Sequence, residues 1–190
     1  MFVTHSHGDH YGGASYLKEN YGARVVASDR DWIVMEGMTA GNRPASFVAP
    51  PTRDVSVKEG QTLTIGGTTF GFVMTPGHTP GAMSIFISPV LDNDQRHVAA
   101  LLNGTATSSP ETTKTLIGSM ERLAARAKTA KVDIQFNNHS FIDDSLPTLE
   151  AVRARKPGEP NPFIIGEEGF QKLAGWLTEC LKADLARTAK

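Results

Sequence analysis

The stretch Thr4-His5-Ser6-His7-Gly8-Asp9-His10 places four strong metal-binding side chains within six consecutive residues. Crowded imidazole and carboxylate groups contribute little to a hydrophobic core, and this spacing favours neither a helix nor a strand. Three imidazoles with one carboxylate suit Zn(II), although Fe or Mn can occupy the same kind of donor set. The stretch therefore predicts a metal-binding loop. It follows residues 1–3, which are predicted to be the end of a strand.

Two further histidines lie where predicted strands end. His78 occurs in the turn Thr-Pro-Gly-His-Thr-Pro-Gly at residues 75–81, and His139 follows a predicted strand at residues 132–136. The six candidate ligands can be shared by two ions, with His5, His7 and His78 on one and Asp9, His10 and His139 on the other. Each set keeps an open position for water, as catalytic zinc sites do. The remaining histidine, His97, is predicted to be a solvated surface residue.

The chemistry predicted from these residues is hydrolysis. A water that bridges a pair of zinc ions loses its proton near neutral pH, and the hydroxide that forms is a nucleophile. Asp9 can both ligate an ion and orient this nucleophile, so it is the candidate catalytic residue. Cleavage of an amide or ester in this way needs no side-chain nucleophile.

The composition predicts a single globular domain over residues 1–190, with 39% hydrophobic and 21% charged residues. A net charge of −1 gives no reason to expect nucleic acid or an anionic membrane as a partner. No apolar run approaches the roughly 20 residues that span a bilayer. The lone Cys180 excludes an internal disulfide and is predicted to be a small buried apolar residue. The first residues show no basic-then-apolar leader.

The pattern along the chain mixes strands and helices, which predicts an α/β fold. A surface loop is expected over residues 39–52. Strands are predicted at residues 24–27, 62–65, 68–74, 84–88, 97–102 and 132–136, and helices at residues 11–21, 29–35, 144–155 and 170–186, with another that begins at Ser109-Pro110.

With these residues in place, the chain resembles the metallo-β-lactamase superfamily. Residues 5–10 match its HxHxDH signature, residues 75–81 match the turn that bears its next ligand, and the likeness extends over residues 1–140. The resemblance implies an αββα sandwich, in which two mixed sheets lie between helical layers and the metals sit at one edge. Family members usually carry some tens of residues before the signature. An N-terminally truncated chain that lacks the first strands of the first sheet is therefore expected, with a free sheet edge and exposed apolar surface.

Residues 102–107 separate the branches of the superfamily. Glyoxalase II-like thioesterases and lactonases usually carry a metal-bridging Asp in a Gly-Asp-Thr-like segment. Here the corresponding stretch is Leu-Asn-Gly-Thr-Ala-Thr, and no acidic residue lies between Ala99 and Ser109. The Cys ligand of the first metallo-β-lactamase subclasses is also missing. The chain thus looks most like the third subclass, which implies that Thr105 and Thr107 help to hold a substrate carboxylate.

The resemblance implies a zinc-dependent hydrolase that uses metal-bound hydroxide to cleave an amide or ester of a small molecule. It is most like a third-subclass metallo-β-lactamase, which would give it a role in antibiotic resistance. One alternative is a thioesterase or lactonase of the same fold, which the absence of the bridging Asp disfavours. Another is a truncated remnant that binds zinc without activity. The sequence leaves the substrate, the oligomeric state and the compartment open, although relatives are often exported to the periplasm.

Overall fold

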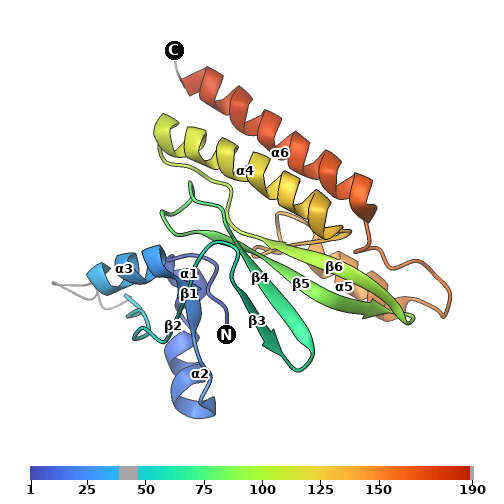
Figure 1. The fold of residues 1–190 in the computed structure, drawn as a ribbon, viewed down its shortest axis with the longest axis horizontal. Helices are drawn as coiled ribbons and strands as arrows, with labels where there is room; N and C mark the ends of the chain where they lie inside the picture. Colours follow the sequence, from blue (N-terminus) through green and yellow to red (C-terminus); the bar gives the residue numbers. More distant parts are fainter. Residues whose placement is uncertain (39–46, 189–190) are drawn as a thin grey trace.

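The structure is a computed structural model that describes residues 1–38 and 47–188. Two β-sheets lie between groups of helices (Figure 1). The helices are α1 (Gly8–Tyr11), α2 (Ala14–Tyr21), α3 (Asp29–Met38), α4 (Pro110–Ala130), α5 (Ser145–Ala154) and α6 (Gly166–Thr188), and the strands are β1 (Val26–Ser28), β2 (Val55–Val57), β3 (Thr62–Ile65), β4 (Thr68–Met74), β5 (Met83–Asp92), β6 (Gln95–Leu102) and β7 (Ile134–Asn137). Among the described residues, no helix is long and apolar enough to cross a bilayer.

The larger sheet has the order β3-β4-β5-β6-β7 and is mixed, because only its last pair, β6 and β7, runs parallel. The smaller sheet consists of the parallel pair β1 and β2. The strand predicted at the N-terminus is reduced to a single parallel bridge between Phe2 and Val26. The predicted α/β sandwich is therefore confirmed, and its first sheet has two strands among the described residues.

Side chains that alternate along the strands give the larger sheet two apolar faces. One face packs against α4 and α6, which lie side by side across it (Figure 1). That core includes Val73, Ala100, Leu102, Leu116, Met120, Leu123 and Phe170. The opposite face meets the smaller sheet through Phe72, Met83, Ile85, Val26 and Val57. A third cluster, which includes Trp32 and Met35, lies between the smaller sheet and helices α1–α3. This order of layers is the predicted one.

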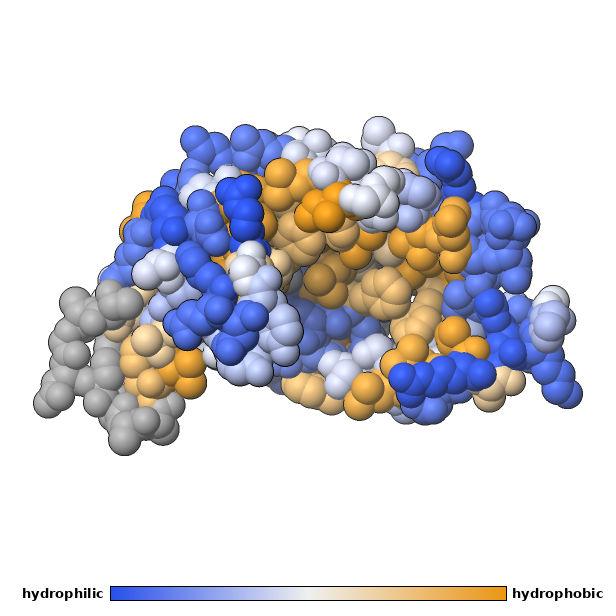
Figure 2. All heavy atoms as spheres, turned by 90° about the horizontal axis from the view of Figure 1, so that it is seen from below, coloured by the Kyte–Doolittle hydropathy of each residue, from blue (hydrophilic) through white to orange (hydrophobic). Residues whose placement is uncertain are grey.

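Apolar side chains also gather in a hollow on the face seen from below (Figure 2). A hollow of about 450 Å3 lies between the smaller sheet and β3, and its lining includes Met1, Phe2, Val55 and Leu63. Apolar surface is therefore accessible beside the two-stranded sheet.

Two predictions about single residues were wrong. Cys180 is exposed, because α6 buries Phe170, Ala174 and Thr178 at intervals of four residues. Cys180 follows Thr178 by two residues, or about 200° around the helix, so it faces solvent. His97 is not a solvated residue: its side chain is 10% exposed, and its Nδ1 lies 2.5 Å from Oδ2 of Asp133.

Most predicted elements are confirmed, with small shifts at their ends. The helix expected over residues 11–21 begins at Ala14 as α2. The expectation that the metal-binding stretch favours no helix was wrong for its last residues, because Gly8–Tyr11 form the short helix α1. The helix start at Ser109 is confirmed, since the Ser109 hydroxyl accepts a hydrogen bond from the backbone N–H of Thr112. The loop expected over residues 39–52 lies partly outside the described residues, and its remainder, residues 47–52, has no regular structure.

Candidate metal centre

Three chain segments that are distant in sequence meet at one edge of the sandwich. The loop at residues 5–10 is attached to the start of β5, because the N–H of Met83 donates to the carbonyl of Thr4 at 2.9 Å. The turn at residues 75–81 is closed at its base by a bond from the N–H of Thr75 to the carbonyl of Ala82. The segment after β7 is held by a bond from the N–H of Asn138 to the carbonyl of Leu102. Ends of several strands therefore fix the site.

The structure brings together all six side chains that the sequence singles out as ligands. They form the two predicted sets, His5 with His7 and His78, and Asp9 with His10 and His139. Within each set, one potential ligand atom from each residue lies within 4.8 Å of the others. Both sets could therefore hold a metal ion after small movements of side chains.

The first set is built around the buried His5. Its Nδ1 lies 3.1 Å from the Thr4 hydroxyl, which in turn accepts a hydrogen bond from the side-chain amide of Asn138. These contacts fix the ring and leave its Nε2 buried, with no hydrogen-bond partner in residues 1–38 and 47–188. The ring of His78 is fixed in the same manner, because its Nδ1 lies 2.6 Å from the carbonyl oxygen of Ala106. Partners of this kind orient the metal-ligating histidines of zinc proteins.

Gly104 allows the His78 ring to lie where it does. A Cβ atom at position 104 would lie 2.5 Å from Cδ2 and 2.6 Å from Nε2 of His78. Any larger residue would therefore force the ring out of its present position in the set.

In the second set, the Nε2 atoms of His10 and His139 face one another at 3.1 Å. The carboxylate of Asp9 lies 3.2 Å from the first and 3.7 Å from the second. Its side chain is 60% exposed, so this set opens toward solvent. The N–H of His139 also donates to the side chain of Asn137 at 3.0 Å, which fixes the loop after β7.

His5, His7 and His10 are held in the neutral form that binds metals. Burial, together with the neighbouring His10, lowers the pKa of His5 to about 2. Burial and the nearby His78 lower the pKa of His7. Burial also lowers the pKa of His10, against the opposing effect of the Asp9 carboxylate. All three imidazoles can therefore offer a lone pair at neutral pH.

Asp31 is an important residue of the site that sequence reasoning missed. Its buried carboxylate accepts hydrogen bonds from the N–H of Ser6 at 2.9 Å, the hydroxyl of Thr79 at 2.7 Å and the N–H of Gly81 at 2.8 Å. Burial raises its pKa, while these bonds act in the opposite direction. Its only sequence signal is an acidic residue at a helix start, which equally fits an exposed first turn.

Comparison with known proteins agrees with this geometry. The sequence profile of the metallo-beta-lactamase superfamily matches residues 1–88. BJP-1, a subclass B3 metallo-β-lactamase of Bradyrhizobium japonicum, is 30% identical, and its structure matches 99% of this chain and 72% of its own with a TM-score of 0.74. The chain belongs to the metallo-β-lactamase superfamily.

Two other relatives extend the comparison. A metallo-β-lactamase from Cronobacter sakazakii is 28% identical, with a TM-score of 0.76 over 98% of this chain and 72% of that chain. A hydroxyacylglutathione hydrolase from Pseudomonas putida strain W619 is 27% identical over 162 residues, which are 85% of this chain and 54% of the relative. The chain thus spans about half the length of the curated relatives it matches first.

The two threonines expected from the superfamily to contact substrate lie on either side of Ala106, whose carbonyl contacts His78. Thr105 and Thr107 also line a hollow of about 350 Å3 against α6, next to Leu177 and Leu181. The hydroxyl of Thr107 lies 2.6 Å from that of Thr113 in α4. A contact of either threonine with substrate stays a prediction.

Proposed function

We propose that this chain is a zinc-dependent hydrolase of a small-molecule amide or ester. His5, His7 and His78 would hold one ion, and Asp9, His10 and His139 a second. The observation that carries the proposal is the buried Nε2 of His5, which has no hydrogen-bond partner among the residues that the structure describes. A buried polar atom without a partner is unfavourable, and a cation at this point would satisfy it. The imidazole-rich donor set also suits zinc.

When bound, a pair of zinc ions supplies an acidified water and polarises the carbonyl group that is attacked. The residues of the chain orient this chemistry. Thr4 and Asn138 fix the His5 ring, and Ala106 fixes that of His78. Asp9 is the proposed catalytic residue, because its carboxylate lies beside His10 at the solvent-facing side of the site. There it can accept a hydrogen bond from an attacking water and set its direction.

The first candidate substrate is a β-lactam, whose hydrolysis would give the protein a role in antibiotic resistance. This candidate is supported by the likeness to BJP-1 and by the absence of an acidic residue between Ala99 and Ser109. The second candidate is a glutathione thioester, which the hydroxyacylglutathione hydrolases among the relatives favour. A third interpretation is a zinc-binding remnant without activity, whose site would hold ions without catalysing hydrolysis.

These candidates can be separated with the whole 190-residue chain. The purified chain is stripped of metal, its zinc stoichiometry is measured, and turnover of nitrocefin, a homoserine lactone and a glutathione thioester is compared. We expect two zinc ions per chain and zinc-dependent turnover of nitrocefin that EDTA abolishes. Faster cleavage of the thioester would replace the lactamase assignment with the second candidate. Two bound zinc ions without any turnover would support the remnant, and no zinc binding would refute the proposal.

A further inference from the structure

Arg30 is a cation without an ionic partner at the start of α3. Both neighbours of Arg30 in sequence are acidic and both are engaged elsewhere. Asp29 forms an ion pair with Lys58 at 3.4 Å, and Asp31 accepts its three hydrogen bonds from the segments of the metal centre. Arg30 itself is exposed and forms no ion pair or hydrogen bond with any described residue.

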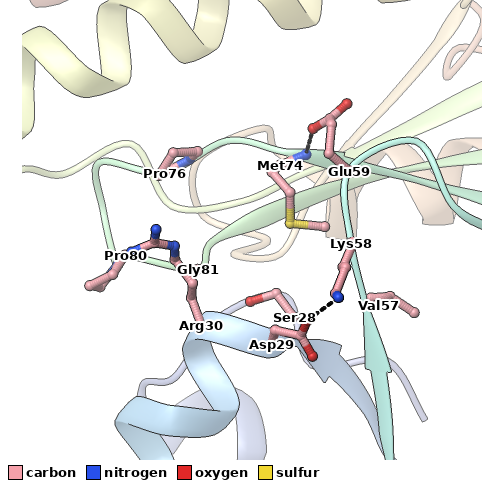
Figure 3. A pocket seen from close by; sticks show the side chains of 10 residues that line it. All are labelled: Ser28, Asp29, Arg30, Val57, Lys58, Glu59, Met74, Pro76, Pro80 and Gly81. Carbon is pink, nitrogen blue, oxygen red and sulfur yellow. Dashed lines mark hydrogen bonds and ion pairs between the residues drawn. The ribbon is translucent and has the colours of Figure 1, made fainter.

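The backbone of Arg30 is fixed relative to His78. The carboxylate of Asp31 is bonded to Thr79 and Gly81, so the first turn of α3 is attached to the turn that carries His78. Figure 3 shows the Arg30 side chain rising from α3 toward Pro80, away from the ion pair of Asp29 with Lys58. The guanidinium group therefore lies beside the outer wall of the turn.

Two hollows meet at this wall, and Arg30, Pro76 and Pro80 line both of them. The smaller has a volume of about 310 Å3 and is the one drawn in Figure 3. The larger, of about 620 Å3, also includes His78 itself and the hydroxyl residues Ser108, Thr112 and Thr115. Arg30 is therefore in the same hollow as a candidate metal ligand.

The charges around the two hollows do not balance. In the smaller one, Asp29 is paired with Lys58, and Glu59 is paired with Arg126 at 2.7 Å. No acidic residue lines the larger one. One positive charge, that of Arg30, is thus left uncompensated next to His78. An unpaired guanidinium in a concave site attracts an anion, and a carboxylate fits its planar pair of donors best.

The hydroxyl groups of the larger hollow differ in availability. Thr112 and Thr115 donate to carbonyl oxygens of α4 and its N-cap, at 2.9 Å in each case. The hydroxyl of Ser108 forms no hydrogen bond with a described residue. Ser108 can therefore add a donor to a bound anion, whereas the two threonines complete the wall.

We propose that Arg30, assisted by Ser108, forms an anion subsite beside His78 that selects substrates bearing a carboxylate. The subsite rests on the proposed function for its role in catalysis, but its binding of a carboxylate does not require the metal. This subsite is distinct from the pair Thr105 and Thr107, which lines the hollow against α6.

The test compares wild type with R30M, R30K and the matched control R96M, since Arg96 is also exposed and has no ion pair with a described residue. In the first arm, glutarate is titrated into the metal-free chain, and the amide NMR signals of Thr79 and Gly81 are followed. Because Arg30 is exposed, its charge interaction with glutarate amounts to at most about 1 kcal/mol. This corresponds to a change of about five-fold in the dissociation constant. We expect R30M to weaken binding about five-fold, R30K to recover part of it, and R96M to match wild type.

The second arm uses the zinc-loaded chain with two esters, anionic mono-4-nitrophenyl glutarate and neutral 4-nitrophenyl butyrate. We expect R30M to lower kcat/KM for the anionic ester about five-fold more than for the neutral one, and added salt to reduce this difference. Absence of turnover of both esters would count against the proposed function alone. Equal binding of glutarate by wild type and R30M would overturn the subsite, whatever the activity.

Discussion

The carboxylate of Asp31 accepts a hydrogen bond from the backbone N–H of Ser6, across 25 residues of sequence, at a distance of 2.9 Å. The same carboxylate is bonded to Thr79 and Gly81 in the turn that carries His78. One buried acid thus connects the two segments that supply His5, His7 and His78. The spacing of the first candidate ligand set depends on this connection, and on Gly81, where a Cβ atom would lie 2.3 Å from the Ser28 hydroxyl.

The substitution D31N tests this connection. Asparagine offers one acceptor oxygen where aspartate offers two, so its NH2 group must face at least one N–H or O–H donor. That donor then lies buried without an acceptor, and we expect the free energy of unfolding to fall by about 2 kcal/mol. We also expect zinc affinity to fall at least about ten-fold, as with partners that orient metal ligands. Urea unfolding of the metal-free chain and zinc competition with a chromogenic chelator measure the two effects.

The control for D31N is D29N at the neighbouring position. Asp29 has a partly exposed ion pair with Lys58, so its loss should change stability by less than about 1 kcal/mol. If D31N unfolds at the same urea concentration as D29N, Asp31 does not connect the two segments as described.

The lowered pKa of His5 predicts acid instability of the metal-free chain. Between its ordinary value of 6.5 and the folded value of about 2, the unfolded state holds a proton that the folded state does not. The free energy of unfolding therefore falls as the pH drops below 6.5, by up to about 1.4 kcal/mol per pH unit for this residue. We expect H5Q to reduce the slope by about 1 kcal/mol per pH unit between pH 6.5 and about 5. Urea unfolding at several pH values gives both slopes, and equal slopes would contradict the assignment.

The metal loops could be predicted from sequence because their signal is local. Four of the six candidate ligands lie within residues 5–10, and His78 and His139 each follow a predicted strand. The hairpin of β3 and β4 was also predicted to the residue, because Gly66 and Gly67 adopt positive φ and interrupt the alternating pattern between the two strands.

What could not be predicted depends on residues that meet only in the folded chain. The partner of His97 is Asp133, which lies 36 residues away, and Asp31 reaches Gly81 across 50 residues. A histidine at the start of a strand looks solvated until the neighbouring strand supplies a carboxylate. Thr105 and Thr107 illustrate the same limit, because the hollow that they line also involves Leu177 and Leu181 of α6, which are distant in sequence.

Gly104 provides a test of the first ligand set. In G104A, the added methyl group would overlap the His78 ring, with contacts of 2.5 and 2.6 Å to Cδ2 and Nε2. His78 must then leave its present position beside His5 and His7, so we expect zinc stoichiometry to fall from two ions to one. Metal analysis after dialysis measures this, and circular dichroism verifies that the chain is folded.

G118A serves as the matched control for G104A. Gly118 lies in α4, and the one described side chain within 4 Å of its added Cβ is the flexible end of Arg122 at 3.5 Å. Alanine should stabilise this helical position by about 0.5–1 kcal/mol and leave zinc binding unchanged. Retention of two zinc ions by G104A would show that His78 is not needed in the first set.

The contact between His97 and Asp133 predicts a stabilising interaction that is independent of the metal centre. Nδ1 of His97 lies 2.5 Å from one carboxylate oxygen of Asp133, and the other oxygen accepts a hydrogen bond from the N–H of Val98 at 3.0 Å. H97A, D133A and the double variant form a cycle in which the loss of the Val98 bond cancels. We expect a coupling free energy of about 1–2 kcal/mol from urea unfolding, with zinc stoichiometry unchanged in all three variants. If the changes in the free energy of unfolding of the two single variants add to that of the double variant, the pair contributes nothing to the stability of the fold. A loss of bound zinc in any variant would instead show that the pair supports the metal centre.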